Sequence, residues 1–509
     1  MNTMSMTKER PATKRIARVF VALTILMSMT SFGLVTGLTL LQTHSAVAAI
    51  GRLSAQNAYI VDPFSSPDWI GETDLDTTIF GASVASAGDV NGDGFDDVIV
   101  GAPYYHHGQE MEGGVFVYHG SATGLKPLSS WSFESNQAMC ELGWSVASAG
   151  DVNGDGYDDV LAASEYCGTG APNREGRVYL FLGSATGLGA THAWMLQGGG
   201  ADESLGWSIA SAGDVNKDGF DDVIIGAPWA SYPEGHEGRA YVFYGSASGL
   251  AANADWTAES NLDWSQFGAS VASAGDVNGD GFDDVIIGHQ SIANPEEGEG
   301  RAYVYLGSAS GLETAPAWMY ENDLALTELG ESVASAGDVN GDGYGDVIVG
   351  GFEYSHPETK EGVAYIFLGS AIGLSWTPDW QAESDQDAAE FGQSVASAGD
   401  VNDDGYDDVL VGAPWYSKGE DYEGVAFLYY GSPTGLLSSP VHLAESNQEG
   451  ANLGYSVASA GDVNGDGISD IIVGAQNYDG GQGNEGRATV YYGIPDLENP
   501  VFIPLILGH

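Results

Sequence analysis

The chain has 509 residues, of which 71 are Asp or Glu and 15 are Lys or Arg, so its formal net charge is −56. Because such a charge repels phosphate backbones, nucleic acid is excluded as an expected partner. The same charge would repel itself within a folded body unless cations neutralised part of it, so the composition favours a protein that binds metal cations.

Residues 1–48 have the pattern of a signal peptide. A basic segment precedes an apolar run from Val19 to Leu41, which is followed by Ala46-Val47-Ala48, the small-x-small pattern of a signal-peptidase site. We therefore expect a secreted, extracellular or cell-surface protein. The apolar run is longer than usual for a signal peptide, so a retained anchor that contacts the membrane is the alternative. Residues 49–65 form a predicted linker.

Residues 66–493 consist of seven repeats of one unit. The stretch from Ser83 to Asp97 returns seven times almost unchanged, and the recurring loops are spaced by 62 or 63 residues. A period this regular leaves no room for an inserted domain and predicts a single repeat architecture. Residues 494–509 form a short apolar tail, too short to span a bilayer.

Each repeat has the signals of four short β-strands. A Phe-Gly or Leu-Gly pair opens the first strand, Ser-Val-Ala-Ser-Ala-Gly, whose small residues suit a crowded position near a central axis. After an Asp-rich loop, a β-branched run such as Asp97 to Pro103 predicts the second strand. A variable loop ends at Glu-Gly, the third strand is aromatic-rich, and the fourth carries a Trp in most repeats. This pattern predicts an all-β fold, a seven-bladed β-propeller of four-stranded blades.

The two ends of the repeat region predict how the ring closes. No fourth strand follows the seventh repeat, whereas a spare strand signal, Asp68-Trp69-Ile70, precedes the first. We expect this N-terminal strand to complete the seventh blade. A solenoid is the alternative, but it needs polar caps rather than a missing strand at one end and a spare strand at the other.

A predicted Ca²⁺ loop joins the first two strands of every repeat. Its pattern, Asp-x-Asn-x-Asp-Gly-x-x-Asp, places side-chain oxygens at positions 1, 3, 5 and 9 and a backbone carbonyl at position 7, the spacing of an EF-hand-type loop. Three clustered carboxylates repel one another unless a cation neutralises them, which disfavours the alternative of a metal-free turn. We therefore predict up to seven Ca²⁺ ions with a structural role. The predicted ligands are Asp89, Asn91, Asp93, Phe95, Asp97; Asp151, Asn153, Asp155, Tyr157, Asp159; Asp214, Asn216, Asp218, Phe220, Asp222; Asp276, Asn278, Asp280, Phe282, Asp284; Asp338, Asn340, Asp342, Tyr344, Asp346; Asp400, Asn402, Asp404, Tyr406, Asp408; and Asp462, Asn464, Asp466, Ile468, Asp470.

The order of Phe-Gly, Ca²⁺ loop and Gly-Ala-Pro is complete from Phe80 to Pro103 and from Phe391 to Pro414. It resembles the FG-GAP repeat family, which includes the N-terminal propellers of integrin alpha subunits, and the resemblance covers all seven repeats. The resemblance implies a seven-bladed propeller with Ca²⁺ in the loops between the first and second strands, on the face opposite the ligand-binding one.

Strand parity places the variable loops on the face opposite the Ca²⁺ loops. Variable loops on a rigid scaffold are common binding sites, and aromatic residues just after the second strand would form a stacking surface there if they are exposed. The alternative is that these aromatic residues cover the end of the blade core. The ligand-face candidates are Tyr104, Tyr105, Tyr166, Trp229, Tyr354, Trp415, Tyr416 and Tyr478.

The two cysteines, Cys140 and Cys167, fall in a blade-to-blade link and in a loop of this same face. A disulfide between them is expected in a protein outside the cytosol, and two free thiols are the alternative. The histidines, including His106, His107 and His289, show no metal-ligand spacing and are expected as ordinary surface residues.

No nucleophile elbow, zinc signature or phosphate-binding loop is present, so no catalytic residue is predicted. The sequence predicts a non-enzymatic adhesion or recognition module, resembling an integrin alpha propeller, whose partner is an extracellular or surface protein. One alternative is a carbohydrate-binding propeller. Another is a non-catalytic module of an extracellular hydrolase or lyase system.

Overall fold

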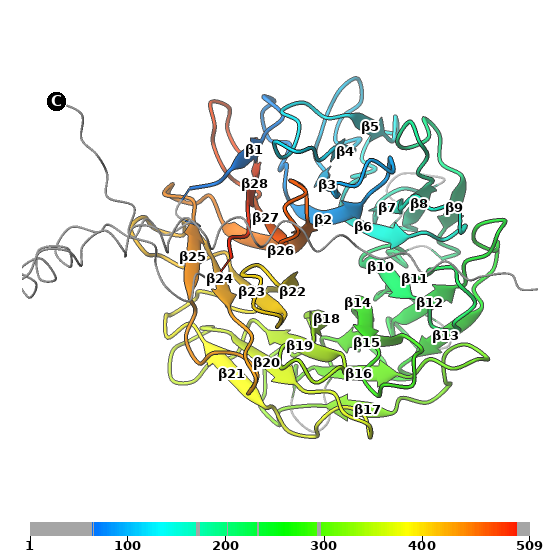
Figure 1. Cartoon of the computed structure of the whole chain (residues 1–509), viewed down its shortest axis with the longest axis vertical. Coiled ribbons are helices and arrows are strands. Elements are labelled where there is room, and N and C mark those ends of the chain that lie inside the picture. The colour runs from blue at the N-terminus through cyan, green and yellow to red at the C-terminus, as the bar shows by residue number, and fades with distance from the viewer. Residues whose placement is uncertain are drawn as a thin grey trace, which may run out of the picture. The chain divides into compact units, whose positions relative to one another are not determined.

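Seven four-stranded antiparallel sheets build the computed structural model of the chain and follow one another around a ring (Figure 1). The structure describes residue 64 and residues 66–168, 174–200, 202–231, 234–292 and 297–495. All the regular elements in this part of the chain are β-strands. The all-β, seven-bladed propeller predicted from the repeats is confirmed, and each sheet is one blade.

The strands of a blade are ordered from the centre of the ring outward (Figure 1). The innermost strands of blades 1 to 7 are β2 (Ser83–Gly88), β6 (Ser145–Gly150), β10 (Ile209–Gly213), β14 (Phe267–Gly275), β18 (Ser332–Gly337), β22 (Ser394–Gly399) and β26 (Leu453–Gly461). The second strands are β3 (Asp97–Ala102), β7 (Asp159–Ser164), β11 (Asp222–Ala227), β15 (Asp284–His289), β19 (Asp346–Gly351), β23 (Asp408–Ala413) and β27 (Asp470–Ala475). The third strands are β4 (Gly114–Tyr118), β8 (Arg177–Phe181), β12 (Arg239–Phe243), β16 (Arg301–Tyr305), β20 (Val363–Phe367), β24 (Val425–Tyr429) and β28 (Arg487–Tyr491). The outermost strands are β5 (Trp131–Glu134), β9 (Trp194–Gln197), β13 (Trp256–Glu259), β17 (Trp318–Tyr320), β21 (Trp380–Glu383), β25 (His442–Glu445) and, in blade 7, β1 (Trp69–Gly71).

The seventh blade takes its outermost strand from the opposite end of the repeat region. Strand β1 pairs antiparallel with β28, so that Trp69 lies opposite Val490 and Gly71 opposite Ala488. Strands from the two ends of the repeat region therefore share one sheet, and blade 7 has four strands like the others.

The Ser-Val-Ala-Ser-Ala-Gly segment forms the inner strand because its small side chains let neighbouring blades approach closely. Inner strands of adjacent blades are in contact around the ring. In β2, Val84 and Ala87 are buried, and the hydroxyl of Ser83 accepts the backbone N–H of Val146 in blade 2 at 3.1 Å. The equivalent bonds join Ser456 to Val84, Ser208 to Val271, Ser270 to Val333, Ser332 to Val395 and Ser394 to Val457.

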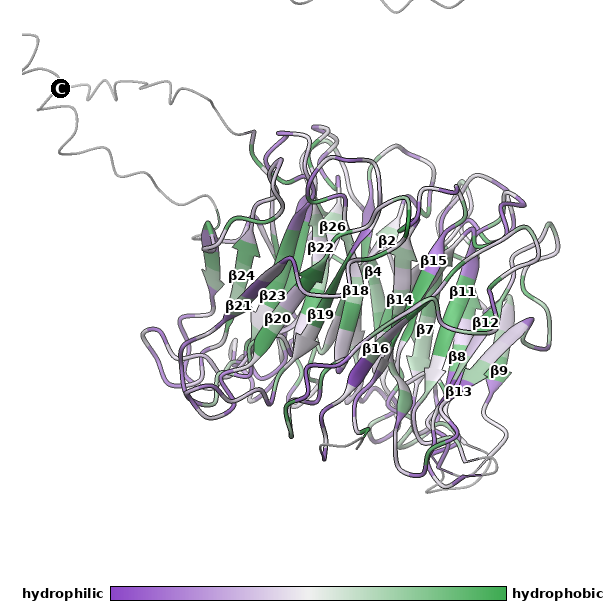
Figure 2. Cartoon of the chain, turned by 90° about the horizontal axis from the view of Figure 1, so that it is seen from below, coloured by the Kyte–Doolittle hydropathy of each residue, from purple (hydrophilic) through white to green (hydrophobic). Residues whose placement is uncertain are grey.

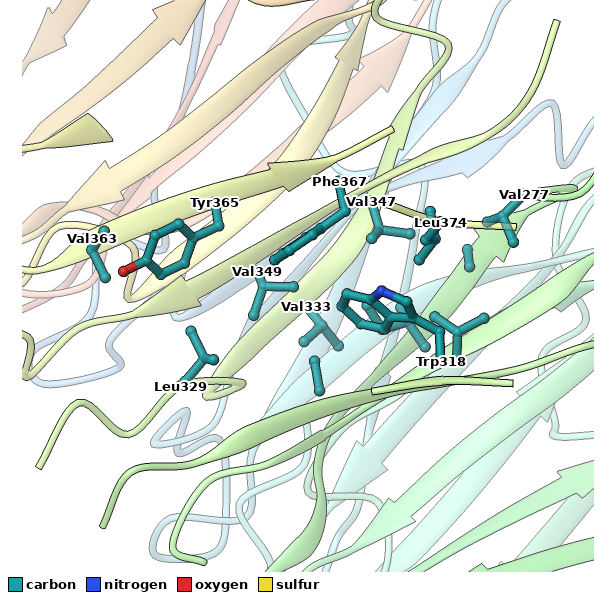
Figure 3. Close-up of a cluster of buried hydrophobic side chains, with 14 of the residues drawn as sticks. Val277, Trp318, Leu329, Val333, Val347, Val349, Val363, Tyr365, Phe367 and Leu374 are labelled. Atoms are coloured by element: carbon teal, nitrogen blue, oxygen red, sulfur yellow. The ribbon is translucent and has the colours of Figure 1, made fainter. Parts of the chain in front are cut away.

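Hydrophobic cores lie between neighbouring blades. Figure 3 shows the core between blades 4 and 5, where Trp318 of β17 packs edge-on against Phe367 of β20 with ring centroids 4.8 Å apart. Val347 and Val349 of β19 fill the space beside these rings. Strand β19 is buried along its whole length, because a core covers each side of it. This explains why the second strands have continuous apolar runs rather than alternating ones.

The Trp of an outer strand is also hydrogen-bonded to the next blade. The indole N–H of Trp131 donates to the carbonyl of Gly189 in blade 2 at 3.0 Å, and that of Trp69 donates to the carbonyl of Lys126 in blade 1 at 3.1 Å. The other bonds of this kind join Trp194 to Ala251, Trp256 to Glu313, Trp318 to Ser375 and Trp380 to Leu437. In blade 6 His442 takes this position, and its Nε2 lies 3.0 Å from the hydroxyl of Tyr430 in its own blade.

The strands end at two faces of the ring, and Figure 2 shows the strands running between them. We call the face with the loops between first and second strands the Asp-loop face. The other face has the loops between second and third strands and the links between blades, and we call it the link face. On the Asp-loop face, the N–H of Ser121 donates to the carbonyl of Val463 at 3.0 Å. On the link face, the N–H of Glu141 donates to the carbonyl of Met111 at 3.1 Å.

Some predictions fall outside the described residues. These are the signal peptide or anchor of residues 1–48, nearly all of the linker at 49–65 and most of the tail at 494–509. Within the part that the structure describes, no helix has the length and apolar character needed to cross a membrane.

Candidate calcium loops and recognition face

The seven Asp loops are folded around their first residue. In blade 1, Oδ1 of Asp89 accepts the backbone N–H groups of Gly92 at 2.7 Å and of Asp93 at 3.1 Å. Its Oδ2 accepts the N–H of Gly94 at 2.8 Å. The glycine at position 6 has a φ of 88°, a left-handed conformation that favours glycine, so the sequence pattern is required by the turn. The same bonds to Oδ1 and Oδ2 recur at Asp151, Asp276 and Asp462.

The ninth residue of each loop is a buried aspartate at the start of the second strand. Asp97 is completely buried, and its Oδ1 accepts the N–H of Gly120 from the turn after the third strand at 2.9 Å. Burial, together with the nearby carboxylates of Asp93 and Asp89, raises the pKa of Asp97 to about 7. Burial likewise raises the pKa of the equivalent aspartates, to about 8 for Asp408 and to about 7 for Asp159, Asp222, Asp284, Asp346 and Asp470.

The donor chemistry of these loops fits Ca²⁺, which takes oxygen ligands from carboxylates, amides and backbone carbonyls. A cation would lower the electrostatic cost of the buried ninth aspartate next to the first and fifth. In this structure, however, the first carboxylate points to the N–H groups of its own loop. Among the described residues, no Asp loop brings three carboxylates within 4.8 Å of one another. Calcium binding by the loops stays a prediction.

The eighth residue of the loop has a role that the sequence pattern did not indicate. Oδ2 of Asp158 in blade 2 accepts the backbone N–H of Asp89 in blade 1 at 2.7 Å. Burial raises the pKa of Asp158, while this hydrogen bond lowers it. We call the residues that make this bond the latch aspartates, and they are Asp96, Asp158, Asp221, Asp283 and Asp407. Gly345 and Ser469 occupy the position in blades 5 and 7.

The eight aromatic candidates all lie at the link face just after second strands, but they differ in exposure. Tyr354 is buried between blades 4 and 5, and the other seven are half-buried. Tyr105 and Tyr416 pack edge-on against Phe116 and Phe427 of their own third strands. Tyr105, Tyr354, Tyr416 and Tyr478 share one position of the repeat. The position before it is occupied by Tyr104, Tyr166, Trp229 and Trp415 in their own repeats. These four are therefore the better candidates for contacting a partner.

Ionisable groups gather near Tyr104 and Tyr166 on the link face. Burial raises the pKa of Glu141 to about 7 and that of Glu165 to about 8, while the Arg174 guanidinium opposes both shifts. The same guanidinium donates to the hydroxyl of Tyr166 and lies over its ring. Aromatic and charged groups thus lie together at blades 1 and 2.

A disulfide joins Cys140 to Cys167 on the link face. It connects the link that enters blade 2 to the loop between β7 and β8, and both residues are buried. Ser164 also donates to the backbone carbonyl of Cys140.

The surface prediction for His289 is wrong. His289 is completely buried at the end of β15, with its ring 5.7 Å from that of Phe267. Burial lowers the pKa of His289 to about 3, helped by the charge of Arg301. His106 and His107 are exposed, as expected.

The comparisons with known proteins agree with the repeat pattern. The FG-GAP repeat matches residues 80–118, 142–181, 205–243, 391–429 and 453–491, and the FG-GAP-like repeat matches 276–349. The chain belongs to the FG-GAP repeat family, and its propeller is of the integrin alpha kind.

Relatives of two kinds share this region. Integrin alpha-4 of Xenopus laevis is 31% identical over 268 residues, which are 50% of this chain and 24% of that protein. Integrin alpha pat-2 of Caenorhabditis briggsae is 30% identical over 299 residues, 53% of this chain and 22% of that protein. Phosphatidylinositol-glycan-specific phospholipase D of Bos taurus is 36% identical over 203 residues, 37% of this chain and 24% of that protein. The chain thus spans about a quarter of the length of these relatives.

Proposed function

We propose that this chain is an extracellular recognition module that binds a partner protein on its link face and is stabilised by Ca²⁺ in its Asp loops. The contrast between the two faces carries the proposal. The Asp loops repeat the same Asp and Asn residues at positions 1, 3, 5 and 9 in every blade, which suits a scaffold. On the link face, by contrast, the residue at the position of Tyr104 differs between blades and is Trp229, Ser291 and Glu353 in blades 3, 4 and 5. A surface that varies from blade to blade suits selective recognition of a partner. The integrin alpha relatives support adhesion as the context.

A capture experiment tests the recognition face. The folded chain, immobilised in millimolar Ca²⁺, is expected to retain a defined protein from cell-surface or matrix extracts. Trp229→Ala and Trp415→Ala should weaken this capture, because truncating an aromatic contact commonly costs more than 1 kcal/mol of binding. Trp376→Ala is the matched control, since Trp376 is 68% exposed in the turn after β20 on the Asp-loop face. If only Trp376→Ala reduced capture, the face assignment would be wrong.

Thermal unfolding with and without a chelator tests the calcium part of the proposal. Ca²⁺ that binds only the folded state must raise the melting temperature, and extracellular sites of this kind bind at roughly 0.1 to 1 mM. We expect a fall in melting temperature when EGTA replaces millimolar CaCl₂. Equal melting temperatures under the two conditions would contradict calcium binding by the Asp loops.

Carbohydrate binding is the second candidate, favoured by a cavity of about 610 Å³ between blades 2 and 3. Its lining places Gln197, Glu203 and Arg239 beside the rings of Tyr241 and Phe243, a combination of polar and aromatic groups that suits a sugar. A glycan array separates the candidates. Glycan binding would favour a lectin, whereas capture of a protein without glycan binding favours adhesion.

The phospholipase D relatives suggest a further context for the same module. The matched part is 24% of the Bos taurus protein, so a propeller of this kind can accompany other domains. We infer that the chain itself is not the catalytic part of such a system. Hydrolysis of a phosphatidylinositol-glycan by the purified chain would contradict this inference.

A further inference from the structure

Three carboxylates meet on the link face of blade 5, at a place that the Asp loops do not reach. Glu358 lies in the loop between β19 and β20, Glu361 lies just before β20, and Asp385 follows β21. One carboxylate oxygen of each residue lies within 4.8 Å of those of the other two. Two oxygens bound to one Ca²⁺ at about 2.4 Å lie at most about 4.8 Å apart, so the cluster falls within the range that a Ca²⁺ site allows.

The buried member of the cluster lacks a partner for one of its oxygens. Glu361 is completely buried, and its Oε1 accepts the backbone N–H of His356 at 2.6 Å. Its Oε2 is buried and has no hydrogen-bond partner among the described residues. Burial, together with the carboxylates of Glu383, Glu358 and Asp385, raises the pKa of Glu361 to about 7. An unpaired buried carboxylate beside other carboxylates is costly unless a cation neutralises it.

Most other blades place a basic side chain near this position, although only that of blade 4 contacts the counterpart of Glu361, and in blade 1 the counterpart Glu112 also has a buried oxygen without a partner among the described residues. In blade 4, Arg301 lies 3.4 Å from Glu299, the counterpart of Glu361, and also pairs with Glu321. Arg239 and Arg487 pair instead with Glu259 and Glu72, the counterparts of Glu383, in blades 3 and 7. In blade 6, Lys418 lies 3.5 Å from Glu445.

Blade 5 has no such basic residue at this place. Val363 occupies the position of the arginine, and Lys360 pairs instead with Glu353. No ion pair within the described part of the chain reaches Glu358, Glu361 or Asp385.

The two segments that carry the cluster are held together independently of any ion. The hydroxyl of Ser384 donates to the carbonyl of Glu361 at 2.7 Å. The N–H of Thr359 donates to Oδ1 of Asp387 at 2.9 Å, and the N–H of Ala388 donates to the carbonyl of Thr359 at 2.7 Å. We propose that Glu358, Glu361 and Asp385 bind a Ca²⁺ ion on the link face of blade 5, in addition to any ions in the Asp loops.

Counting bound calcium tests this proposal. Equilibrium dialysis of the full chain at about 1 mM CaCl₂ gives the number of Ca²⁺ ions per chain. The double variant Glu358→Gln/Asp385→Asn is expected to bind one ion fewer than the wild type. Both new residues occur at the equivalent positions of other blades, as Gln109 and Asn136 in blade 1, so the variant is expected to fold.

Two further variants make the result specific. Val363→Arg introduces the cation that blades 3, 4 and 7 use and is also expected to remove one ion. Asp74→Asn is the matched control, because Asp74 has the position and left-handed φ of Asp385 in blade 7, where Arg487 is present; it should leave the count unchanged. Crystals grown in CaCl₂ should show anomalous density between the three carboxylates. Equal counts in the wild type and in both the double variant and Val363→Arg would overturn the proposal, whether or not the Asp loops bind calcium.

Discussion

A Cβ atom added to Gly345 of blade 5 would lie 3.3 Å from the backbone nitrogen of Asp276 in blade 4. In five other pairs of neighbouring blades, this nitrogen donates to the carboxylate of a latch aspartate. Blade 5 therefore presents the donor but not the acceptor, and the added Cβ would also lie 3.0 Å from the carbonyl oxygen of Ala274, so the neighbouring strand must shift slightly to admit a side chain.

Gly345→Asp is expected to stabilise the propeller by about 1 kcal/mol, because it adds a hydrogen bond to a charged acceptor and restricts the unfolded chain. Denaturant unfolding measures the gain. Asp158→Ala is the reciprocal variant and should lose about 1 to 2 kcal/mol, since it removes the bond to Asp89. If the latch hydrogen bond does not contribute to stability, both variants should have the same free energy of unfolding as the wild type.

Removing the disulfide should destabilise blade 2. Cys140 and Cys167 are 27 residues apart, and closing a loop of this size restricts the unfolded chain by about 3 to 4 kcal/mol. The variant Cys140→Ala/Cys167→Ala should therefore unfold at a lower denaturant concentration than the oxidised wild type. Reduced wild type is the control and should resemble the variant. The prediction fails if reduction leaves the midpoint of the wild type unchanged.

The stability contributed by Glu165 should fall as pH rises. Burial raises the folded pKa of Glu165 to about 8, above its unfolded value, so the folded state binds more protons between these two values. Ionisation is then a cost, on the order of 4 kcal/mol at pH 8. Glu165→Gln cannot ionise, so its advantage over the wild type should grow from pH 5 to pH 8. An advantage that does not change with pH would show that Glu165 titrates normally.

His289 should give the opposite pH dependence. Burial lowers the folded pKa of His289 to about 3, below its unfolded value, so the unfolded state binds more protons as the pH falls. The wild type should lose about 2 kcal/mol from this group between pH 7 and pH 5. His289→Ala introduces alanine, the residue found at the equivalent position of blade 1, Ala102. The unfolding free energy of this variant should change less between pH 7 and pH 5 than that of the wild type. Equal pH dependence of the two proteins would contradict the burial of a neutral imidazole.

The repeat period explains how much of the fold could be predicted. A strand signal that is weak in one repeat is supported by the same signal in the other six, so the four strands per repeat and the fold class could be predicted from the sequence. The position of Trp69 could be inferred by counting strands. The partner of Asp158 could not, because its donor lies 69 residues earlier in another blade and no local spacing indicates it. Asp385 likewise joins Glu358 and Glu361 only because the fold brings two separate segments together.

His289 shows a prediction that failed although the sequence contained the signal. It occupies the last position of a second strand, where blades 1, 3, 6 and 7 have a buried alanine. Alignment of the repeats would have placed His289 in the interior, whereas its polar side chain suggested the surface. Position in the repeat was the better guide, because the geometry of the blade decides burial.

Among the described residues, the seam between blades 6 and 7 lacks both the latch bond and the Trp bond, whereas the seam between blades 4 and 5 lacks only the latch. Ser469 replaces the latch aspartate, and His442 replaces the Trp that donates to the next blade. The meeting of blades 7 and 1, by contrast, has the bonds from Asp96 to Asp462 and from Trp69 to Lys126. Under mechanical load, blades 6 and 7 should therefore separate first, although the chain runs directly from one to the other. Blades 7 and 1, where the two ends of the repeat region meet, should stay in contact.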